Sequence, residues 1–270
     1  MNPIANARMY AVTPEAEAAW MALLAHVAAE AGVALTYERY PAPQPLEILW
    51  RRPDLGAVFM CGYPIALGLA QVVPLASPIP AAPWATGKAL YRSDFVVQAD
   101  SRFRTLEETF GGTIGWTVEH SHSGFNAPRH HLLALRRQDG IPLYRKSVGG
   151  LVTARGIVDA VIDRRIDVGP LDGYWHLLLQ RHRPDLTDQL RVVASTDLAP
   201  LPALVAAPGL PAENVEALRR CFADAAVRPW FAPLAETLCL QGFAPVTRES
   251  FAVTRGWASE AEAAGYLQPG

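Results

Sequence analysis

The sequence predicts an α/β protein in which two regions are each built from strands and helices in alternation. Strand-like and helix-like segments alternate along most of the 270 residues, which is typical of sheets covered by helices on both faces. The apolar run Gly56 to Cys61 suits a strand buried on both faces of a parallel sheet. Two proline-punctuated segments, 76–86 and 195–202, interrupt the pattern and mark where the chain passes between regions.

The N-terminal elements follow from local patterns. A strand is expected over 7–12. A helix follows, with Thr13 as its N-cap, Pro14 at its first position and Gly32 at its end. We expect further strands over 33–37, 56–61 and 71–75, a short helix from about Pro64, and a loop over 76–86.

The later elements repeat the alternation. Helices are expected through Arg136, over 153–164, from Ala212 and from Thr247. Strands are expected over 90–98, 113–118, 166–171, 189–194 and 203–206. If both punctuated segments are crossings, residues 93–195 form an inserted region, and residues 1–92 with 196–270 form the other region.

Composition excludes several classes of protein. The formal net charge of −2 gives no support for a nucleic-acid partner, because binding to the phosphate backbone needs a basic surplus. Three widely spaced cysteines argue against a disulfide framework. No apolar run approaches the roughly 20 residues of a membrane helix, so no membrane insertion is expected. The first residues lack the pattern of a secretory leader.

The polar segment 119–126 is the most informative part of the chain, because it follows an expected strand and opens a helix. The first turn of a helix leaves amide N–H groups without intrahelical partners and favours negative charge. Ser121 and Ser123 add hydroxyl donors, and Gly124 would let a ligand approach the backbone. An anion site and simple helix capping by serine both remain open from these residues alone.

The histidines near this segment invite a metal hypothesis, which we do not favour. His120, His122, His130 and His131 are close in sequence, yet no His-x-x-x-His pair occurs and no acid or cysteine clearly completes a tetrahedral set. His122 is expected to donate a hydrogen bond to an anion or to be solvated. No metal and no cofactor are expected.

Three further polar side chains stand at positions where strands end. Asp172 follows the strand 166–171, where it could hold a ligand amine or cap the next helix. Tyr63 follows Cys61 and Gly62, and Tyr91 lies on the strand 90–98. Each phenol could donate to an anion or pack in the core.

The sequence lacks the common motifs of catalytic sites. The sequence has no Gly-x-Ser-x-Gly elbow, no Walker loop and no Gly-x-Gly-x-x-Gly motif. Ser123 has a histidine beside it in sequence, but no orienting carboxylate is evident. We therefore expect a binding protein and not an enzyme.

Several segments, in this order and spacing, resemble the substrate-binding proteins of phosphate, phosphite and phosphonate ABC transporters. The resemblance runs from about Met9 to Ala206. It is carried by 59–64 (FMCGYP), 91–97 (YRSDFVV), 121–125 (SHSGF) and 167–172 (DVGPLD), with Thr196 and the later Pro200-Leu201-Pro202 at the family's second crossing.

This resemblance implies a two-lobed type II periplasmic binding protein with a ligand cleft between lobes joined by two crossing strands. It implies that Ser121, His122, Ser123 and Gly124 hold an oxyanion of the phosphonate or phosphate class. It also implies that Tyr63 and Tyr91 surround this oxyanion and that Asp172 meets any ligand amine. The implied partners are a small anionic ligand and an ABC permease.

Two departures from the family pattern keep alternatives open. Gly149-Gly150-Leu151 lacks a histidine that many relatives carry before the next helix, and no leader is seen, so a periplasmic and a cytoplasmic location both stay open. The alternatives are a different ligand, such as a thiamine-precursor pyrimidine or another aromatic compound, and a cytoplasmic enzyme or sensor on the same fold.

Overall fold

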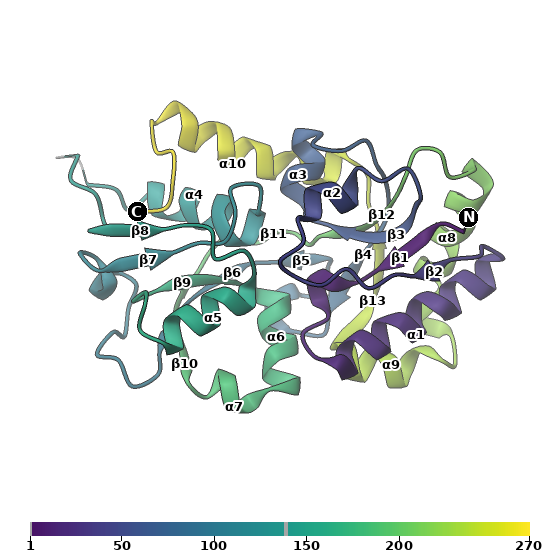
Figure 1. The fold of residues 1–270 in the computed structure, drawn as a ribbon, viewed down its shortest axis with the longest axis horizontal. Coiled ribbons are helices and arrows are strands. Elements are labelled where there is room, and N and C mark those ends of the chain that lie inside the picture. Colours follow the sequence, from purple (N-terminus) through teal and green to yellow (C-terminus); the bar gives the residue numbers. More distant parts are fainter. Residues whose placement is uncertain (1, 138–139) are drawn as a thin grey trace. The chain divides into compact units, whose positions relative to one another are not determined.

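The computed structural model describes residues 2–137 and 140–270 and divides the chain into two compact units. Unit 1 comprises Met1–Tyr91 and Pro200–Ala252, and unit 2 comprises Arg92–Ala199 and Val253–Gly270. The chain therefore passes between units three times (Figure 1). Residues 253–270 were expected in the first region. The structure groups them with unit 2, where the Thr254 carbonyl accepts the Asn126 side chain and the Ala264 carbonyl accepts Arg136.

Unit 1 contains a six-stranded sheet with the order β13-β4-β12-β3-β1-β2. Only the pairs of β1 with β2 and of β1 with β3 are parallel, and the other pairs are antiparallel. The expectation of a parallel sheet thus holds for one side of this sheet only. Its strands are β1 (Ile4–Asn6), β2 (Thr36–Tyr37), β3 (Leu55–Met60), β4 (Val73–Pro80), β12 (Ala203–Ala206) and β13 (Leu240–Pro245).

The helices of unit 1 start largely where the local signals predict. Thr13 Oγ1 accepts the amide of Ala16 at 3.2 Å, and Gly32 ends the first helix in the left-handed conformation. The helices are α1 (Pro14–Ala31), α2 (Leu46–Trp50), α3 (Gly62–Leu67), α8 (Ala212–Ala223) and α9 (Phe231–Leu238).

Two expected elements of unit 1 are wrong. The segment 7–12 is no strand, because the strand ends at Asn6 and Arg8–Tyr10 forms a 3-10 turn. The segment 76–86 is no simple loop, since residues through Pro80 belong to β4. Pro78 and Pro80 are two residues apart, so their missing N–H groups fall on the same side of the strand, and the pairing with β12 is irregular next to Pro74.

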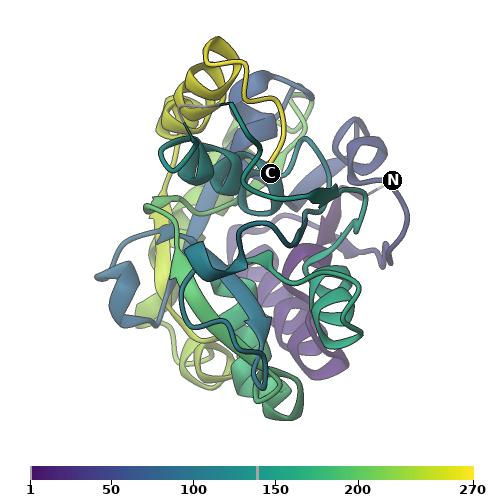
Figure 2. The same cartoon turned by 90° about the vertical axis from the view of Figure 1, so that its left-hand side faces the viewer.

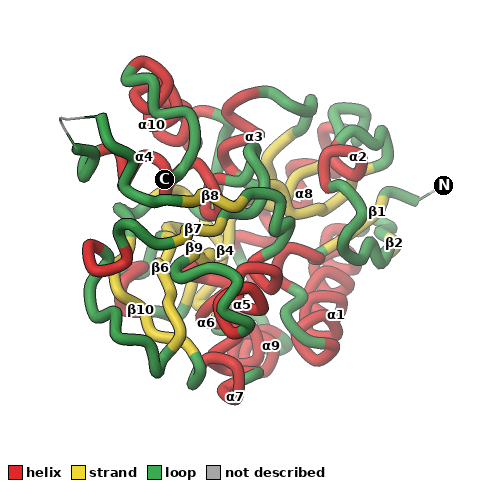
Figure 3. Tube along the Cα trace, turned by 60° about the vertical axis from the view of Figure 1, so that its left-hand side comes forward, coloured by secondary structure: helices red, strands yellow, loops and turns green. Residues whose placement is uncertain are grey.

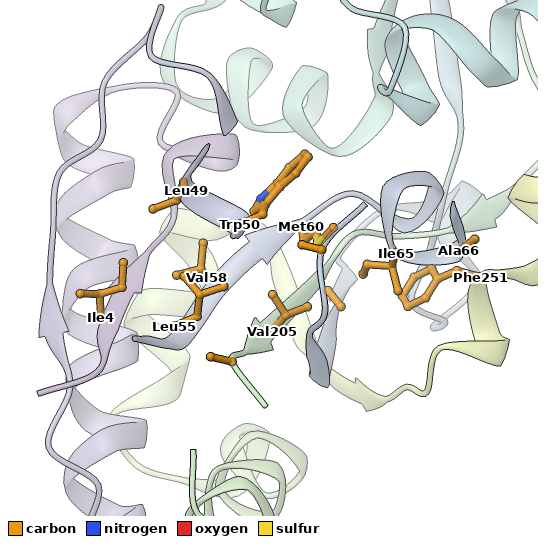
Figure 4. Close-up of a cluster of buried hydrophobic side chains, with 13 residues drawn as sticks. Ile4, Leu49, Trp50, Leu55, Val58, Met60, Ile65, Ala66, Val205 and Phe251 are labelled. Atoms are coloured by element: carbon orange, nitrogen blue, oxygen red, sulfur yellow. The ribbon is translucent and has the colours of Figure 1, made fainter. Parts of the chain in front are cut away.

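The core of unit 1 is almost purely apolar (Figure 4). β3 is buried along its whole length and carries Val58 and Met60 into a cluster that also holds Trp50 of α2 and Phe251. The Trp50 indole N–H donates to the carbonyl of Phe59 at 2.9 Å, so its one polar atom is satisfied. This packing fixes the position where β3 ends and α3 begins.

Unit 2 is built around a three-stranded sheet with the order β10-β6-β9, in which both pairs are antiparallel (Figure 3). This corrects the expectation of a parallel sheet there. Its strands are β6 (Ser93–Gln98), β9 (Gly169–Asp172) and β10 (Leu190–Ser195), and a parallel pair is formed by β7 (Thr113–Gly115) and β8 (Lys146–Val148).

The single strand expected over 90–98 is divided at Arg92. β5 (Leu90–Tyr91) forms a two-stranded sheet with β11 (Ala199–Pro200), and β6 belongs to the sheet of unit 2. Both short strands lie where the chain passes from one unit to the other.

The helices of unit 2 come from distant parts of the chain. In Figure 2, α10, drawn in yellow, runs beside α4. The helices are α4 (Ala127–Leu133), α5 (Ala154–Ile162), α6 (Gly173–His182), α7 (Pro184–Thr187) and α10 (Ala252–Ala263). Across residues 2–137 and 140–270, no helix combines the length and the apolar character needed to cross a bilayer.

Candidate binding site

Tyr63 and Tyr91 lie in unit 1 near the end of β3. Tyr63 is the second residue of α3, directly after the strand. The Tyr91 hydroxyl lies 3.8 Å from Sγ of Cys61, the residue that precedes α3. The two rings are only 6 % and 1 % exposed, so each also serves the core of unit 1. The structure thus brings both tyrosines to one region of unit 1.

The segment 121–126 forms one short turn in unit 2. Ser121 caps it, because its Oγ accepts the amide of Gly124 at 3.0 Å and its carbonyl accepts the amide of Asn126 at 3.0 Å. Residues His122–Asn126 then form a π-type turn that continues directly into α4. Ser121 is therefore a helix cap. Because its oxygen accepts in this bond, the hydroxyl hydrogen can still donate to another group.

Gly124 is required for a reason that the sequence did not reveal. A Cβ at this position would lie 1.9 Å from Oγ1 of Thr117, and the Thr117 amide donates to the Gly124 carbonyl at 3.1 Å. In the direction of a Cβ, the space beside Gly124 is therefore filled by the protein's own threonine. The approach of a ligand to the Gly124 backbone stays a prediction.

Ser123 and Asp172 are brought together, although they are 49 residues apart. Ser123 Oγ donates to Asp172 Oδ2 at 3.3 Å. The other oxygen of Asp172 accepts the amides of Tyr174 and Trp175, both at 3.0 Å, so the carboxylate caps α6. Asp172 is therefore a helix cap, which is one of the two roles considered for it. Its second oxygen faces the Ser123 hydroxyl in the candidate site.

His122 is buried and neutral. Its side chain is 1 % exposed, and burial, with a smaller contribution from His130, lowers the pKa of His122 to about 3. The Asn126 side-chain nitrogen lies 3.2 Å from His122 Nδ1, and an amide nitrogen can only donate, so the ring proton is placed on Nε2. A solvated His122 is excluded, and the ring supplies no positive charge at neutral pH.

The other histidines have structural contacts of their own. His130 Nε2 lies 2.8 Å from a Glu260 carboxylate oxygen, and the His131 ring lies 5.3 Å from that of Phe95. Within the described residues, no three His, Cys, Asp or Glu side chains are close enough together to hold a metal ion.

Sequence reasoning missed a buried charged group next to this site. Asp94 Oδ2 lies 2.9 Å from His176 Nδ1, while Oδ1 accepts Ser195 Oγ at 2.7 Å and Arg92 Nε at 2.9 Å. Burial alone would raise the pKa of Asp94, but the hydrogen bonds from His176 and Ser195 and the nearby positive charge outweigh it and lower that pKa. One signal was available, because Asp94 is an acid directly before the apolar run Phe95 to Val97 of a strand.

Backbone contacts connect this group to Asp172. Ser93 lies opposite Asp172 in the pairing of β6 with β9, and Ser93 Oγ donates to the Ser123 carbonyl at 2.9 Å. The Gly173 amide donates to the Arg92 carbonyl at 2.8 Å, where an added Cβ would lie 2.8 Å from the same oxygen. Ser123 and Asp172 are therefore held by the strands around them.

A cavity of about 340 Å³ in unit 1 contains none of the predicted site residues. Arg219 is its charged residue, but that guanidinium already donates to the Pro74 carbonyl at 2.7 Å and to Glu216 at 2.7 Å. The cavity is lined by Leu75, Arg219, Pro245, Val246, Thr247 and Ser250.

Comparison with solved structures gives the same fold over nearly the whole chain. A binding protein of an ABC phosphonate transporter from Pseudomonas aeruginosa is 18 % identical, with a TM-score of 0.79 over 97 % of this chain and 87 % of that one. PhnD1 from Prochlorococcus marinus, in complex with methylphosphonate, is 13 % identical, with a TM-score of 0.77 over 97 % of this chain and 98 % of that one. At these identities the likeness shows a type II periplasmic binding protein fold.

The same fold occurs outside transport. A histidine kinase sensor domain with similarity to periplasmic binding proteins is 13 % identical, with a TM-score of 0.58 over 90 % of this chain and 97 % of that one. No curated protein matches the sequence.

The sequence also matches the pattern of one protein family over most of its length. The model for periplasmic substrate-binding proteins of phosphonate ABC transporters matches residues 11–251, which is most of the chain. Members of this family bind substrates and are not enzymes. The chain therefore belongs to the family of periplasmic phosphonate-binding proteins of ABC transporters.

Proposed function

We propose that this protein binds a small oxyanion of the phosphonate or phosphate class and delivers it to an ABC permease. The proposed ligand contacts are Tyr63, Tyr91, Ser121, His122, Ser123, Gly124 and Asp172. The observation that carries the proposal is the pairing of Ser123 with Asp172 beside the turn at Ser121, where hydroxyl groups and the start of a helical segment lie together.

The carboxylate of Asp172 narrows the chemistry of the ligand. A dianion next to this carboxylate is repelled, and the neutral His122 does not offset that repulsion. An ammonium group or a protonated phosphonate oxygen can instead donate to Asp172. We therefore expect 2-aminoethylphosphonate to bind more tightly than phosphate.

Calorimetry with phosphate, phosphite, methylphosphonate and 2-aminoethylphosphonate tests the proposal. Ser123→Ala should weaken binding by about 1–3 kcal/mol if the hydroxyl turns from Asp172 to donate to a charged oxygen of the ligand. Ser77→Ala is a matched control, since Ser77 is also buried and donates to the Leu201 carbonyl at 3.0 Å within unit 1. Binding of a pyrimidine, with none of the four oxyanions bound, would overturn the proposal.

Asp172→Asn separates the amine from the oxyanion. The change keeps an oxygen that can cap α6 but removes the negative charge. Binding of 2-aminoethylphosphonate should weaken by roughly tenfold, whereas methylphosphonate should bind equally or better. Equal weakening of both ligands would show that Asp172 acts only as a cap. A permease gene and an ATPase gene beside this one would support uptake.

A further inference from the structure

Helix α10 packs against the proposed ligand turn within unit 2. Arg136 of the segment after α4 donates to the Ala264 carbonyl at 3.0 Å, and α10 runs beside α4 in Figures 1 and 2. The residues of α10 are more than 120 positions beyond the turn in sequence, so no local pattern reports this contact.

The indole of Trp257 is the centre of this contact. It stacks with His122 at a ring distance of 5.3 Å and an interplanar angle of 25°, and with His130 at 4.9 Å and 3°. His130 is fixed in turn by Glu260, one helical turn after Trp257. One aromatic side chain of α10 therefore contacts both the start of the turn and the helix that follows it.

A polar contact lies next to the aromatic one. The side-chain nitrogen of Asn126 donates to the Thr254 carbonyl at 2.7 Å, and its oxygen accepts Nη2 of Arg129 at 3.1 Å. Arg129 also donates to the Leu267 carbonyl at 3.3 Å. Asn126, Arg129 and Thr254 are at most 3 % exposed, so these bonds are made away from solvent.

The turn needs such external support. A π-type turn is rare and occurs mostly as a single turn next to α-helix, so contacts with other segments are expected to stabilise it. Inside the turn, Ser121 supplies a cap, while Thr117 fills the space beside Gly124. The contacts from α10 act on His122 and Asn126, the first and last residues of the turn.

We infer that Trp257 is a positioning residue that holds the turn Ser121–Asn126 in its binding geometry through His122. Trp257 contacts the turn through the His122 ring and is not among the proposed ligand contacts. The part of this inference that concerns affinity rests on the proposed function, whereas the part that concerns the turn does not.

Trp257→Leu tests the inference, because leucine keeps an apolar side chain but cannot stack. Hydrogen exchange at the amides of Gly124 and Asn126 should become about tenfold faster, since both amides are bonded only while the turn is formed. The Kd for methylphosphonate or 2-aminoethylphosphonate should rise by about tenfold. In Trp257→Phe, the exchange rates and the Kd should differ from wild type by only two- to fourfold, because the smaller ring still stacks.

Trp230→Leu is the matched control. Trp230 stacks on His26 in unit 1 at 5.0 Å and 2°, which repeats the Trp–His stack without touching the turn. The Trp230→Leu variant should change neither the hydrogen exchange of the Gly124 and Asn126 amides nor the affinity for the oxyanion. Unchanged exchange in Trp257→Leu, or equal acceleration in Trp230→Leu, would overturn the inference.

The outcomes separate the two proposals. If the wild-type protein binds no oxyanion, the proposed function fails, and the exchange measurement still decides the role of Trp257. If Trp257→Leu does not fold, Trp257→Phe decides alone, and wild-type exchange rates at Gly124 and Asn126 in that variant would contradict the inference.

Discussion

The two units bury different kinds of side chain. Among the described residues, Asn6 and Ser77 are the buried polar side chains of unit 1. Unit 2 buries Ser93, Asp94, Thr109, Thr117, His122, Ser123, Asn126, Arg129, Asp172, His176, Thr196 and Thr254. Burial of apolar side chains stabilises the fold but does not depend on their orientation. Buried hydrogen bonds fix the orientation of both partners, and removing one partner is costly because the other is left unpaired. Unit 1 is thus built for stability, and unit 2 for exact placement of polar groups.

The largest expected effect is a truncation in the apolar core of unit 1. Trp20 is fully buried, and its ring packs edge-on against Phe59 at 5.0 Å. Trp20→Ala should lower the free energy of unfolding by about 3–5 kcal/mol, measured by urea denaturation. The Kd of the folded protein should stay within about threefold of wild type. A large loss of affinity at unchanged stability would break the contrast between the units.

A polar deletion in unit 2 should cost almost as much. Asp94→Ala leaves His176 and Arg92 without their carboxylate and should cost about 3 kcal/mol at pH 7. Because the pKa of Asp94 is lowered in the folded protein, this stabilisation is present above the unfolded value near 3.8 and is lost as the pH falls through the folded value.

The exposed pair of Asp100 with Arg164, at 2.9 Å, provides the control for this deletion. Asp100→Ala should cost no more than about 1 kcal/mol, because exposed ion pairs contribute little. Equal losses in both variants would show that burial of Asp94 adds nothing to its contribution.

His122 should make unit 2 sensitive to acid. The unfolded chain binds a proton near pH 6.5, but the folded protein binds it only near pH 3, so the free energy of unfolding falls as the pH drops between these values. This contribution is at most about 1.4 kcal/mol per pH unit. His122→Gln should flatten the stability profile between pH 6 and 4, which denaturation at several pH values can measure; a slope equal to wild type would contradict the buried neutral histidine.

The smallest effect is expected at the cap. Ser121→Ala should lower the free energy of unfolding by about 1 kcal/mol, as expected for a lost N-cap. Thr153→Ala removes a comparable cap, from Gly156 at the start of α5, and should cost a similar amount. Only Ser121→Ala should weaken oxyanion binding. If both variants bind equally well, Ser121 is a cap and nothing more.

The sequence predicted those elements whose limits depend on neighbouring residues in the chain. The limits of α1 and the strand β12 follow from caps, turns and short apolar runs, and the segment 121–126 was recognised as a helix start. The strand expected over 71–75 was extended to Pro80 as β4, because sheet partners on both sides override the proline signal. The role of Gly124 was missed because Thr117 fills its space only in the folded turn.

The environment of the candidate residues depends on distant partners. His122 is kept neutral by burial that includes Trp257, 135 positions later, and Asp94 meets His176 across 82 positions. Such pairs have no spacing rule, so the sequence could name His122 and Asp172 as candidates without giving their charge states or their contacts. The polar half of the molecule is therefore the harder half to predict.

The return of the chain to unit 2 after Ala252 has a practical consequence for dissecting the protein. A recombinant fragment cut to Arg92–Ala199 would look like a continuous domain in sequence. It would lack the Thr254 and Leu267 carbonyls, leaving the buried amide of Asn126 and guanidinium of Arg129 short of acceptors. Such a fragment should be prone to misfolding, whereas one carrying residues 253–270 as a second peptide or a fused tail should behave as an autonomous module.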